Sequence, residues 1–176
     1  MGREVRRVPP GWEHPRYTKK DARELRCIGE YRPCFDEDYD AAAKKWDESY
    51  MLWREGKHPN QVDWCRYFWE YDPPPDATSY RPAFTGPATW YQVYETVSEG
   101  CPVTPPFSSL EELARYLSEH GDFWYQSQER EGRLRGNRKP TYEQALAMVS
   151  EGWGPSMIVE RGPEGAKITG PYGEEA

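Results

Sequence analysis

Aromatic and alanine side chains recur at steps of three or four residues between Asp36 and Gly56. This spacing places them on one face of an α-helix. Asp36 or Asp38 is positioned to cap the start of that helix, and Gly56 is a natural stop. The pattern therefore predicts a helix whose apolar face is formed by Tyr39, Ala42, Ala43, Trp46, Tyr50 and Trp53.

Two further helices are predicted where a Ser or Thr is followed three residues later by Glu or Gln, the spacing of a capping box. They cover 109–121 and 141–152. We also expect a helix over 88–100, because a proline precedes this segment and a glycine ends it. The tetrapeptide VSEG closes two of these segments, at Gly100 and Gly152. We interpret it as a helix stop that is used twice, not as a duplicated active site.

Strand patterns are shorter. Charged and apolar residues alternate in REVRRVP at 3–9, which predicts a short edge strand that prolines end. We expect 101–107 to be extended and 155–170 to form a terminal β-hairpin around RGPEG. The aromatic-dense stretch 60–72 fits either a short helix or a strand, and 72–87 is expected to be a proline-rich surface loop.

Together these elements predict an α+β fold that is mainly helical, with long proline-rich loops and a small antiparallel sheet that includes the C-terminal hairpin. A chain of 176 residues suits one hydrophobic core better than two. We expect one domain, 1–176. It contains a basic N-terminal strand and loop segment (1–35), an acidic, aromatic-rich helical part (36–125), and a helix followed by the hairpin (140–170).

The composition favours a folded chain with an uneven charge. Aromatic residues make up 15% of the sequence, whereas disordered chains are usually poor in aromatics. Residues 1–26 carry eight Lys/Arg and four Asp/Glu, while residues 27–125 carry eight and eighteen. The acidic middle argues against a protein that coats DNA generally. It fits either a surface that meets a basic partner or a charge that keeps the chain soluble.

The four cysteines and three histidines lack the spacing of a zinc site, so we expect no metal and no cofactor. Free thiols in a reducing cytoplasm are the expected state. The start MGREVRRVPP has no apolar stretch typical of a signal peptide. No segment approaches the roughly 20 apolar residues of a membrane span. We therefore expect a cytoplasmic protein without a membrane partner.

No motif predicts catalysis. The acidic cluster at 36–40 has the composition of a divalent-cation site, but it is also what a helix start normally contains. Walker, dinucleotide-binding, G-x-S-x-G and H-E-x-x-H motifs are absent. The histidines have no nucleophile at a spacing that sequence defines. We therefore select no catalytic residue.

Two arginine-rich stretches provide the candidates for ligand or partner binding, the second of them in a polar loop expected at 126–140. Arginine binds phosphate through paired hydrogen bonds, and a neighbouring ring can stack on a base. The alternative is that these arginines are solvated and neutralise the acidic middle. The candidates are Arg3, Arg6, Arg7, Trp12, His14, Trp90, Tyr91, Tyr94, Arg133, Arg135, Arg138 and Lys139.

Residues 64–71 contain five aromatic rings in eight positions. Consecutive side chains point in different directions on any helix or strand. Most of these rings are expected in the core, and the remainder must face a loop, a partner or a ligand.

Four blocks of the chain resemble a group of uncharacterised bacteriophage proteins. They are REVRRVPPGWEHPR at the N-terminus, then ATWYQVYETVSEGCPVTPPF, SLEELARYLSEHGDF and ALAMVSEGWGPSMIV. The resemblance covers the N-terminus and most of the second half of the chain. It implies no activity and no catalytic residues. It implies a small viral protein made by a phage or prophage in the host bacterial cytoplasm.

For such an accessory protein we expect a binding function. The first hypothesis is a non-enzymatic, anti-defence inhibitor that docks on a host protein of a bacterial defence system, with its acidic middle facing a basic nucleic-acid channel. The alternative is a sponge that sequesters a nucleotide immune signal, with arginines on the phosphates and rings on the bases. The weakest hypothesis is an enzyme that degrades such a nucleotide. The oligomeric state and the convergence of the two arginine stretches stay open.

Overall fold

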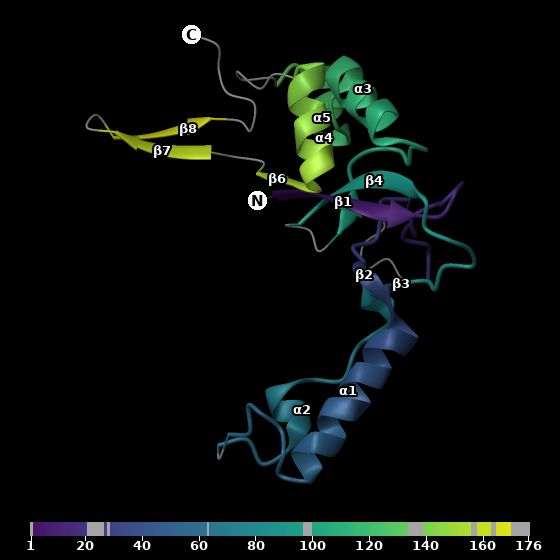
Figure 1. The fold of residues 1–176 in the computed structure, drawn as a ribbon, viewed down its shortest axis with the longest axis vertical. Coiled ribbons are helices and arrows are strands. Elements are labelled where there is room, and N and C mark those ends of the chain that lie inside the picture. The colour runs from purple at the N-terminus through teal and green to yellow at the C-terminus, as the bar shows by residue number, and fades with distance from the viewer. Residues whose placement is uncertain are drawn as a thin grey trace. The chain divides into compact units, whose positions relative to one another are not determined.

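The computed structural model describes residues 2–20, 27, 29–62, 64–96, 100–133, 139–155, 158–162 and 165–169. It confirms an α+β fold with helices and a four-stranded antiparallel sheet. Its residues group into two compact units, coloured along the chain in Figure 1. Unit 1 comprises Met1–Pro33 and Phe84–Ala176, and unit 2 comprises Cys34–Ala83. The expectation of one domain stays a prediction, and each unit is described by itself.

Unit 1 is built on a sheet with the strand order β5-β4-β1-β6. Its central strands are β1 (Gly2–Val8) and β4 (Trp90–Glu95), which pair antiparallel. β6 (Trp153–Pro155) flanks β1, and β5 (Cys101–Pro102) flanks β4. The predicted N-terminal strand and the extended segment after residue 100 are confirmed. The edge position expected for the N-terminal strand is wrong, because β6 pairs with the other side of β1.

The helix predicted over 88–100 is wrong, because its first half forms β4. The sequence WYQVYE alternates between the two faces of the sheet. Tyr91 and Val93 face the apolar cluster of unit 1, whereas Tyr94 belongs to a buried polar cluster on the other face. Aromatic and β-branched side chains favour a pleated surface, and pairing with β1 satisfies the backbone. The first VSEG therefore follows a strand. Its residues 97–99 lie outside the described residues, and Gly100 has φ +97°.

Helices α3 (Leu110–His120) and α5 (Tyr142–Glu151) form a second layer of unit 1 and pack against each other. Figure 1 shows them side by side over the sheet. Burial of aliphatic side chains between these helices and the sheet removes apolar surface from water and stabilises the unit. The buried members of this cluster are Val93, Val103, Leu113, Ala114, Leu117, Ala145, Met148 and Val149.

The helix ends of unit 1 follow the sequence predictions. Thr141 and Gln144 form a reciprocal capping box at the start of α5. The Ser109 hydroxyl accepts from the Glu112 backbone N–H, but the Glu112 carboxylate accepts from Ser108, one residue earlier than a capping box requires. Gly152 ends α5 in the left-handed region with φ +79°, so the second VSEG is confirmed as a helix stop.

Part of the expected polar loop at 126–140 is helical. Residues 126–130 form the C-terminal half of α4 (Phe123–Arg130), which Asp122 caps. Beyond α4, residues 134–138 lie outside the described residues. The predicted terminal hairpin is confirmed as β7 (Ile158–Gly162) and β8 (Gly165–Thr169), which form a separate two-stranded antiparallel sheet.

Unit 2 is built around α1 (Tyr39–Arg54), whose N-cap is Asp38, as predicted. The aromatic-dense stretch contains the short helix α2 (Phe68–Tyr71). The expected loop at 72–87 also contains the 3-10 turn η2 (Ala77–Ser79) and the strand β3 (Tyr80–Arg81), which pairs parallel with β2 (Phe35–Asp38). The part predicted to be helical, 36–125, is thus mixed.

Aromatic rings dominate the core of unit 2. Phe68 and Trp53 are 1% and 7% exposed, and Cys65 is buried beside them. Trp46, Tyr50 and Tyr71 pack around this centre with ring centroids 5.2–6.3 Å from that of Phe68. Within the described part of the chain, no helix combines the length and apolar character needed to cross a membrane.

Candidate functional site

The N-terminal candidates lie together around β1 and β4 of unit 1. In the register of these strands, Arg7 lies opposite Tyr91. Its guanidinium carbon is 4.9 Å from the centroid of the Tyr91 ring, and that of Arg6 is 4.5 Å from the centroid of the Tyr94 ring. The sheet thus unites arginines and rings that are far apart in sequence.

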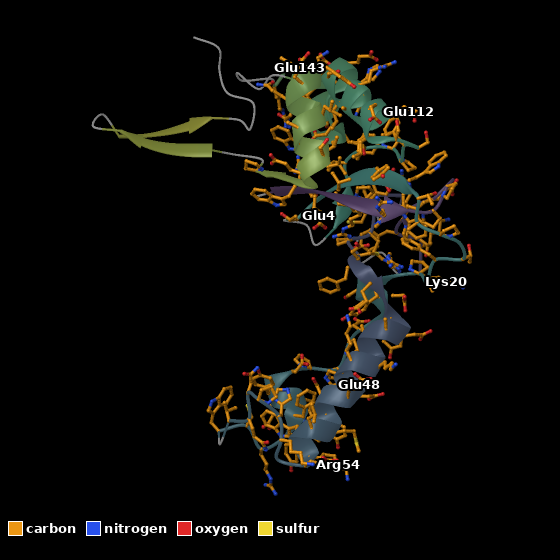
Figure 2. The ribbon with its side chains drawn as sticks, viewed as in Figure 1. Glu4, Lys20, Glu48, Arg54, Glu112 and Glu143 are labelled. Atoms are coloured by element: carbon orange, nitrogen blue, oxygen red, sulfur yellow. The ribbon has the colours of Figure 1, made fainter. Side chains whose placement is uncertain are left out.

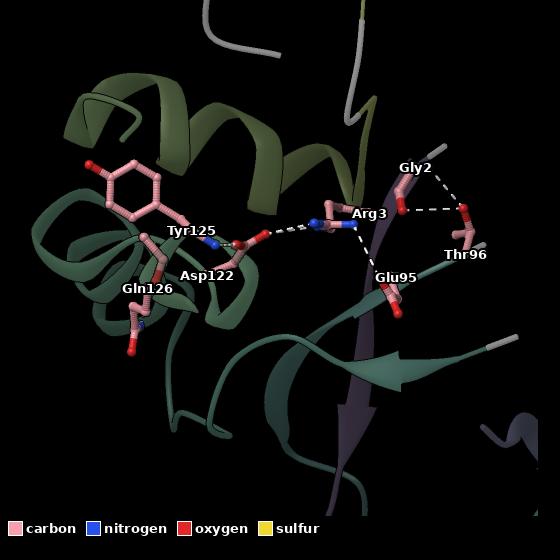
Figure 3. A network of polar contacts seen from close by, with 8 residues as sticks. Gly2, Arg3, Glu95, Thr96, Asp122, Tyr125 and Gln126 are labelled. Atoms are coloured by element: carbon pink, nitrogen blue, oxygen red, sulfur yellow. Dashed lines mark hydrogen bonds and ion pairs between the residues drawn. The ribbon is translucent and has the colours of Figure 1, made fainter. Parts of the chain in front are cut away.

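Arg3 is committed to a contact within the fold (Figure 3). Its Nε and Nη2 donate to Oδ2 of Asp122 at 3.0 and 2.8 Å, and its Nη1 lies 3.7 Å from the Glu95 carboxylate. The other oxygen of Asp122 accepts from the Tyr125 backbone N–H at 2.8 Å and so caps α4. The Arg3 side chain is only 13% exposed. This network joins the start of β1 to the start of α4.

Arg6 also has internal partners. It forms an ion pair with Glu4 of the same strand, its side chain is 11% exposed, and its guanidinium lies over Tyr94. Arg7 is exposed at the end of β1. A guanidinium already held by a carboxylate has fewer donors to offer a phosphate. The geometry therefore gives Arg3 and Arg6 structural roles.

A buried polar cluster lies on the face of the sheet opposite α3 and α5. The Tyr94 hydroxyl accepts from Trp12 Nε1 at 3.2 Å and donates to Gln92 Oε1 at 2.8 Å. His14 Nδ1 is 3.4 Å from the same hydroxyl. His14 Nε2 is 2.8 Å from the Arg32 carbonyl oxygen, so Nε2 carries the hydrogen of the neutral ring. Trp12 and His14 thus attach the N-terminal loop to the sheet.

Burial lowers the pKa of His14 from 6.5 to about 4, and the nearby Arg6 and Arg32 guanidiniums act in the same direction. His14 is therefore neutral at pH 7. A general base must reach its substrate, whereas the His14 side chain is 6% exposed and both of its nitrogens contact protein groups. The arrangement makes His14 a structural residue.

The remaining candidates have other surroundings. Arg133 is exposed and lies 3.0 Å from Glu131 at the end of α4. Lys139 Nζ donates to the Glu119 carbonyl oxygen of α3 at 2.7 Å. Trp90 is half-buried at the start of β4. Arg135 and Arg138 lie outside the described residues, so the convergence of the two arginine stretches stays open.

Cation ligands do not gather in the described part of the chain. No group of three or more His, Cys, Asp or Glu residues there is arranged to hold a metal ion. The four cysteines are free thiols, of which Cys34 and Cys65 are buried.

Three exposed rings of unit 2 come from the aromatic-dense stretch 64–71, and we call them the ring patch: Trp64, Tyr67 and Trp69, with 77%, 40% and 49% of their surface exposed. Phe35 and Tyr39 of the same unit are also exposed. None of them was selected as a candidate from sequence. The aromatic density at 64–71 predicted that some rings there would face outwards, but it did not identify them. Burial of Cys65 and Phe68 decides which side of the segment faces solvent.

A fixed local structure holds Tyr67 and Trp69 of the ring patch. The Glu70 carboxylate accepts from the backbone N–H groups of Arg66 and Tyr67 at 3.0 and 3.2 Å, which closes the start of α2. Phe68 anchors the same turn in the aromatic core. Tyr67 and Trp69 stack with centroids 4.6 Å apart and planes 6° from parallel. These rings are therefore presented in a defined arrangement.

Unit 2 also carries most of the acidic excess, with eleven Asp/Glu against six Lys/Arg in its sequence. A shallow groove runs along α1. Figure 2 labels Glu48 and Arg54 on this helix. Two exposed apolar side chains lie in this groove among four acidic residues and one lysine; its lining is Asp40, Ala43, Lys44, Asp47, Glu48, Met51, Leu52 and Glu55. Unit 2 thus combines exposed apolar groups with negative charge.

Comparison of the chain with family models, with curated proteins and with solved structures finds no match in any of the three.

Proposed function

We propose that this protein is a non-enzymatic, phage-encoded binding protein that docks on a host protein through the ring patch and inhibits a component of a bacterial defence system. The observation that carries the docking is the exposure of Trp64, Tyr67 and Trp69, of which Tyr67 and Trp69 stack on a fixed turn. The four sequence blocks that resemble bacteriophage proteins support the biological setting.

Exposed rings on a rigid support favour protein binding for a physical reason. Trp and Tyr bury large areas at low entropy cost and are enriched among the residues that dominate interface energies. Their exposure leaves apolar surface in water, and a partner that covers it gains about 25 cal/mol per Å². A flexible ring loses part of this gain when it becomes ordered, whereas Tyr67 and Trp69 are already stacked.

The test is capture of host proteins by the purified chain at defined stoichiometry. The wild type is compared with a ring-patch variant, Trp64→Ala/Tyr67→Ala/Trp69→Ala, and with Trp124→Ala. Trp124 is a matched control because it is as exposed as Trp69, at 49%, and lies outside the patch. We expect one stoichiometric host protein with the wild type and the control, and its loss with the ring-patch variant. Absence of a stoichiometric partner, or its retention by the ring-patch variant, would contradict docking at this surface.

The nucleotide-sponge hypothesis has less support, because two of the three N-terminal arginines that would bind phosphate, Arg3 and Arg6, are already paired with carboxylates. Arg7 is the exposed one. A panel of cyclic nucleotides tests this alternative by the melting temperature. A nucleotide that raises it for the wild type but not for Arg7→Glu, and that is recovered intact, would replace docking with sequestration.

A further inference from the structure

Three neighbouring groups of unit 2 combine ring stacking with a cation–π contact. The ring centroids of Tyr67 and Trp69 lie 4.6 Å apart and their planes are nearly parallel. The Arg66 guanidinium carbon lies over the Tyr67 ring, 5.3 Å from its centroid. An indole and a guanidinium thus both contact one phenol ring.

Trp69 leaves part of its surface open beside this stack. The indole stacks on Tyr67, and 49% of the residue is nevertheless exposed. The face of an aromatic ring is its negative region, and the indole of Trp attracts cations more strongly than Tyr or Phe. Arg66 already contacts the Tyr67 ring in this way.

The charge of unit 2 selects what can reach this face. Eleven acidic residues against six basic ones produce a negative field that draws cations towards the unit and repels polyanions. Bases of a nucleic acid also stack on Trp, but their phosphates would meet this repulsion. A cationic protein segment fits both the rings and the charge.

We propose that the ring patch binds an arginine-bearing segment of the partner, with one guanidinium stacked on the exposed part of the Trp69 indole. This inference rests on the proposed docking function and specifies the chemistry of its partner. Arginine is preferred over lysine because its guanidinium is planar and weakly hydrated, whereas an ammonium keeps its water.

The experiment uses the full chain and three 12-residue peptides as probes. Two alternate Gly with Arg or with Lys and have equal charge, and the third alternates Gly with Gln. Binding is followed by fluorescence anisotropy of the labelled peptides and by the NMR shift of the Trp69 Nε1–H. We expect the Arg peptide to bind about 2- to 5-fold more tightly than the Lys peptide, because a guanidinium stacks on the indole with less loss of hydration than an ammonium. We expect no binding of the Gln peptide.

Three variants locate the effect. Trp69→Ala should reduce the affinity for the Arg peptide to that for the Lys peptide, and Trp69→Phe should lie between Trp69→Ala and the wild type. Trp124→Ala, with the same exposed fraction, should bind as the wild type does. Melting curves establish that the Trp69 variants remain folded.

Several results would overturn the inference. Equal affinity for the Arg and Lys peptides would mean that charge alone attracts them. An equal loss in Trp124→Ala would place the contact elsewhere. A larger shift of the Trp69 Nε1–H with oligo-dT than with the Arg peptide would assign the face to nucleic acid. If a host protein is captured through the ring patch while the peptides show no arginine preference, docking stands and this inference fails. If the peptides show an arginine preference that depends on Trp69 but no host protein is captured, the arginine contact stands and docking on a host protein fails.

Discussion

The two units use their polar and aromatic residues in opposite ways. In unit 1, aliphatic side chains of α3 and α5 form the core, and the charged or polar candidates are drawn into contacts such as Arg3 with Asp122 and His14 with Tyr94. In unit 2, rings form the core itself, and further rings remain on the surface. Arg3, Arg6 and His14 of unit 1 are therefore held by internal contacts, although Trp124 and Trp153 of that unit are exposed. The aromatic-dense stretch of unit 2 leaves three of its rings on the surface.

Size accounts for much of this contrast. A small unit has a high ratio of surface to volume, so it buries a smaller fraction of its side chains than a large one does. Phe68 and Trp53 already fill the centre of unit 2. Trp64, Tyr67 and Trp69 have no interior left to enter.

The largest expected effect is on the aromatic core. Phe68→Ala removes the most buried ring of unit 2 and should lower the free energy of unfolding by about 3–5 kcal/mol, from lost burial and the cavity left behind. Leu113→Ala, at a side chain with 0% exposure in unit 1, should lower it by about 2–5 kcal/mol. Amide hydrogen exchange assigns each loss to a unit. We expect α1 to lose protection in the first variant and α3 in the second.

Leu52→Ala is the control for these core variants, because Leu52 is 42% exposed. It should change stability by less than about 0.5 kcal/mol. If Phe68→Ala exposes α3 as strongly as α1, the two units unfold together and the contrast between them is structural but not energetic.

The second effect tests the buried polar cluster of unit 1. The pKa of His14 is about 4 in the folded chain and near 6.5 when unfolded. The unfolded state therefore binds more protons between these values, and stability should fall as the pH decreases from 6.5 to 4, by about 2–3 kcal/mol. The stabilisation that depends on neutral His14 is fully present above pH 6.5. Urea unfolding of the wild type and of His14→Gln across this range measures it.

His14→Gln should keep the pH dependence of the carboxylates and lose that of the imidazole. The two stability curves should therefore converge as the pH falls. Curves that stay parallel from pH 7 to pH 4 would show that burial of His14 does not control the pH response. Hydrogen exchange should place the acid-sensitive protection in unit 1.

A third variant tests whether arginines of unit 1 are structural. Arg3→Met removes a guanidinium held by two hydrogen bonds to Asp122 and should lower the free energy of unfolding by about 2 kcal/mol, the value of hydrogen bonds between charged groups. Arg133→Met is the control, because its ion pair with Glu131 joins a 71% exposed arginine to a half-exposed glutamate. Exposed pairs contribute about 0–1 kcal/mol. Equal effects of the two variants would return Arg3 to the list of binding candidates.

The smallest expected effect compares equivalent helix ends. Gly152 follows α5 in unit 1 and Gly56 follows α1 in unit 2, with φ values of +79° and +70°. In both, an added Cβ meets nothing within 4 Å, so the cost of alanine comes from the left-handed backbone alone, about 1 kcal/mol. Gly86→Ala, at an ordinary φ with equal space, should be neutral in thermal melts. A cost at one helix end only would reveal a constraint peculiar to that unit.

Local signals predicted the elements that depend on local physics. The helix at Tyr39–Arg54 and the capping box at Thr141 follow from spacing and cap chemistry, and both are confirmed. The helix prediction for the strand Trp90–Glu95 is wrong because the pairing partner of this strand lies near the N-terminus. The spacing of residues along the sequence carries no information on so distant a contact. The same reason explains why β1 was expected at an edge.

The sequence indicated arginines and rings as candidate binding residues, and this stays a prediction. Sequence selected arginines next to rings, and the structure does bring Arg6 and Arg7 onto Tyr94 and Tyr91. The sequence could not reveal that Arg6 pairs with Glu4 and Arg3 with Asp122, because such ion pairs depend on strand register and helix placement. Nor could aromatic density separate Phe68 from Trp69, which differ only in the side of a short turn that faces the core.

The two outer strands of the four-stranded sheet each include a proline, Pro102 in β5 and Pro155 in β6, and they are two and three residues long. Proline lacks the N–H that an incoming strand would need, and short edges offer little template for one. The four-stranded sheet is thereby protected against edge-to-edge polymerisation, because strand addition is disfavoured at both of its sides.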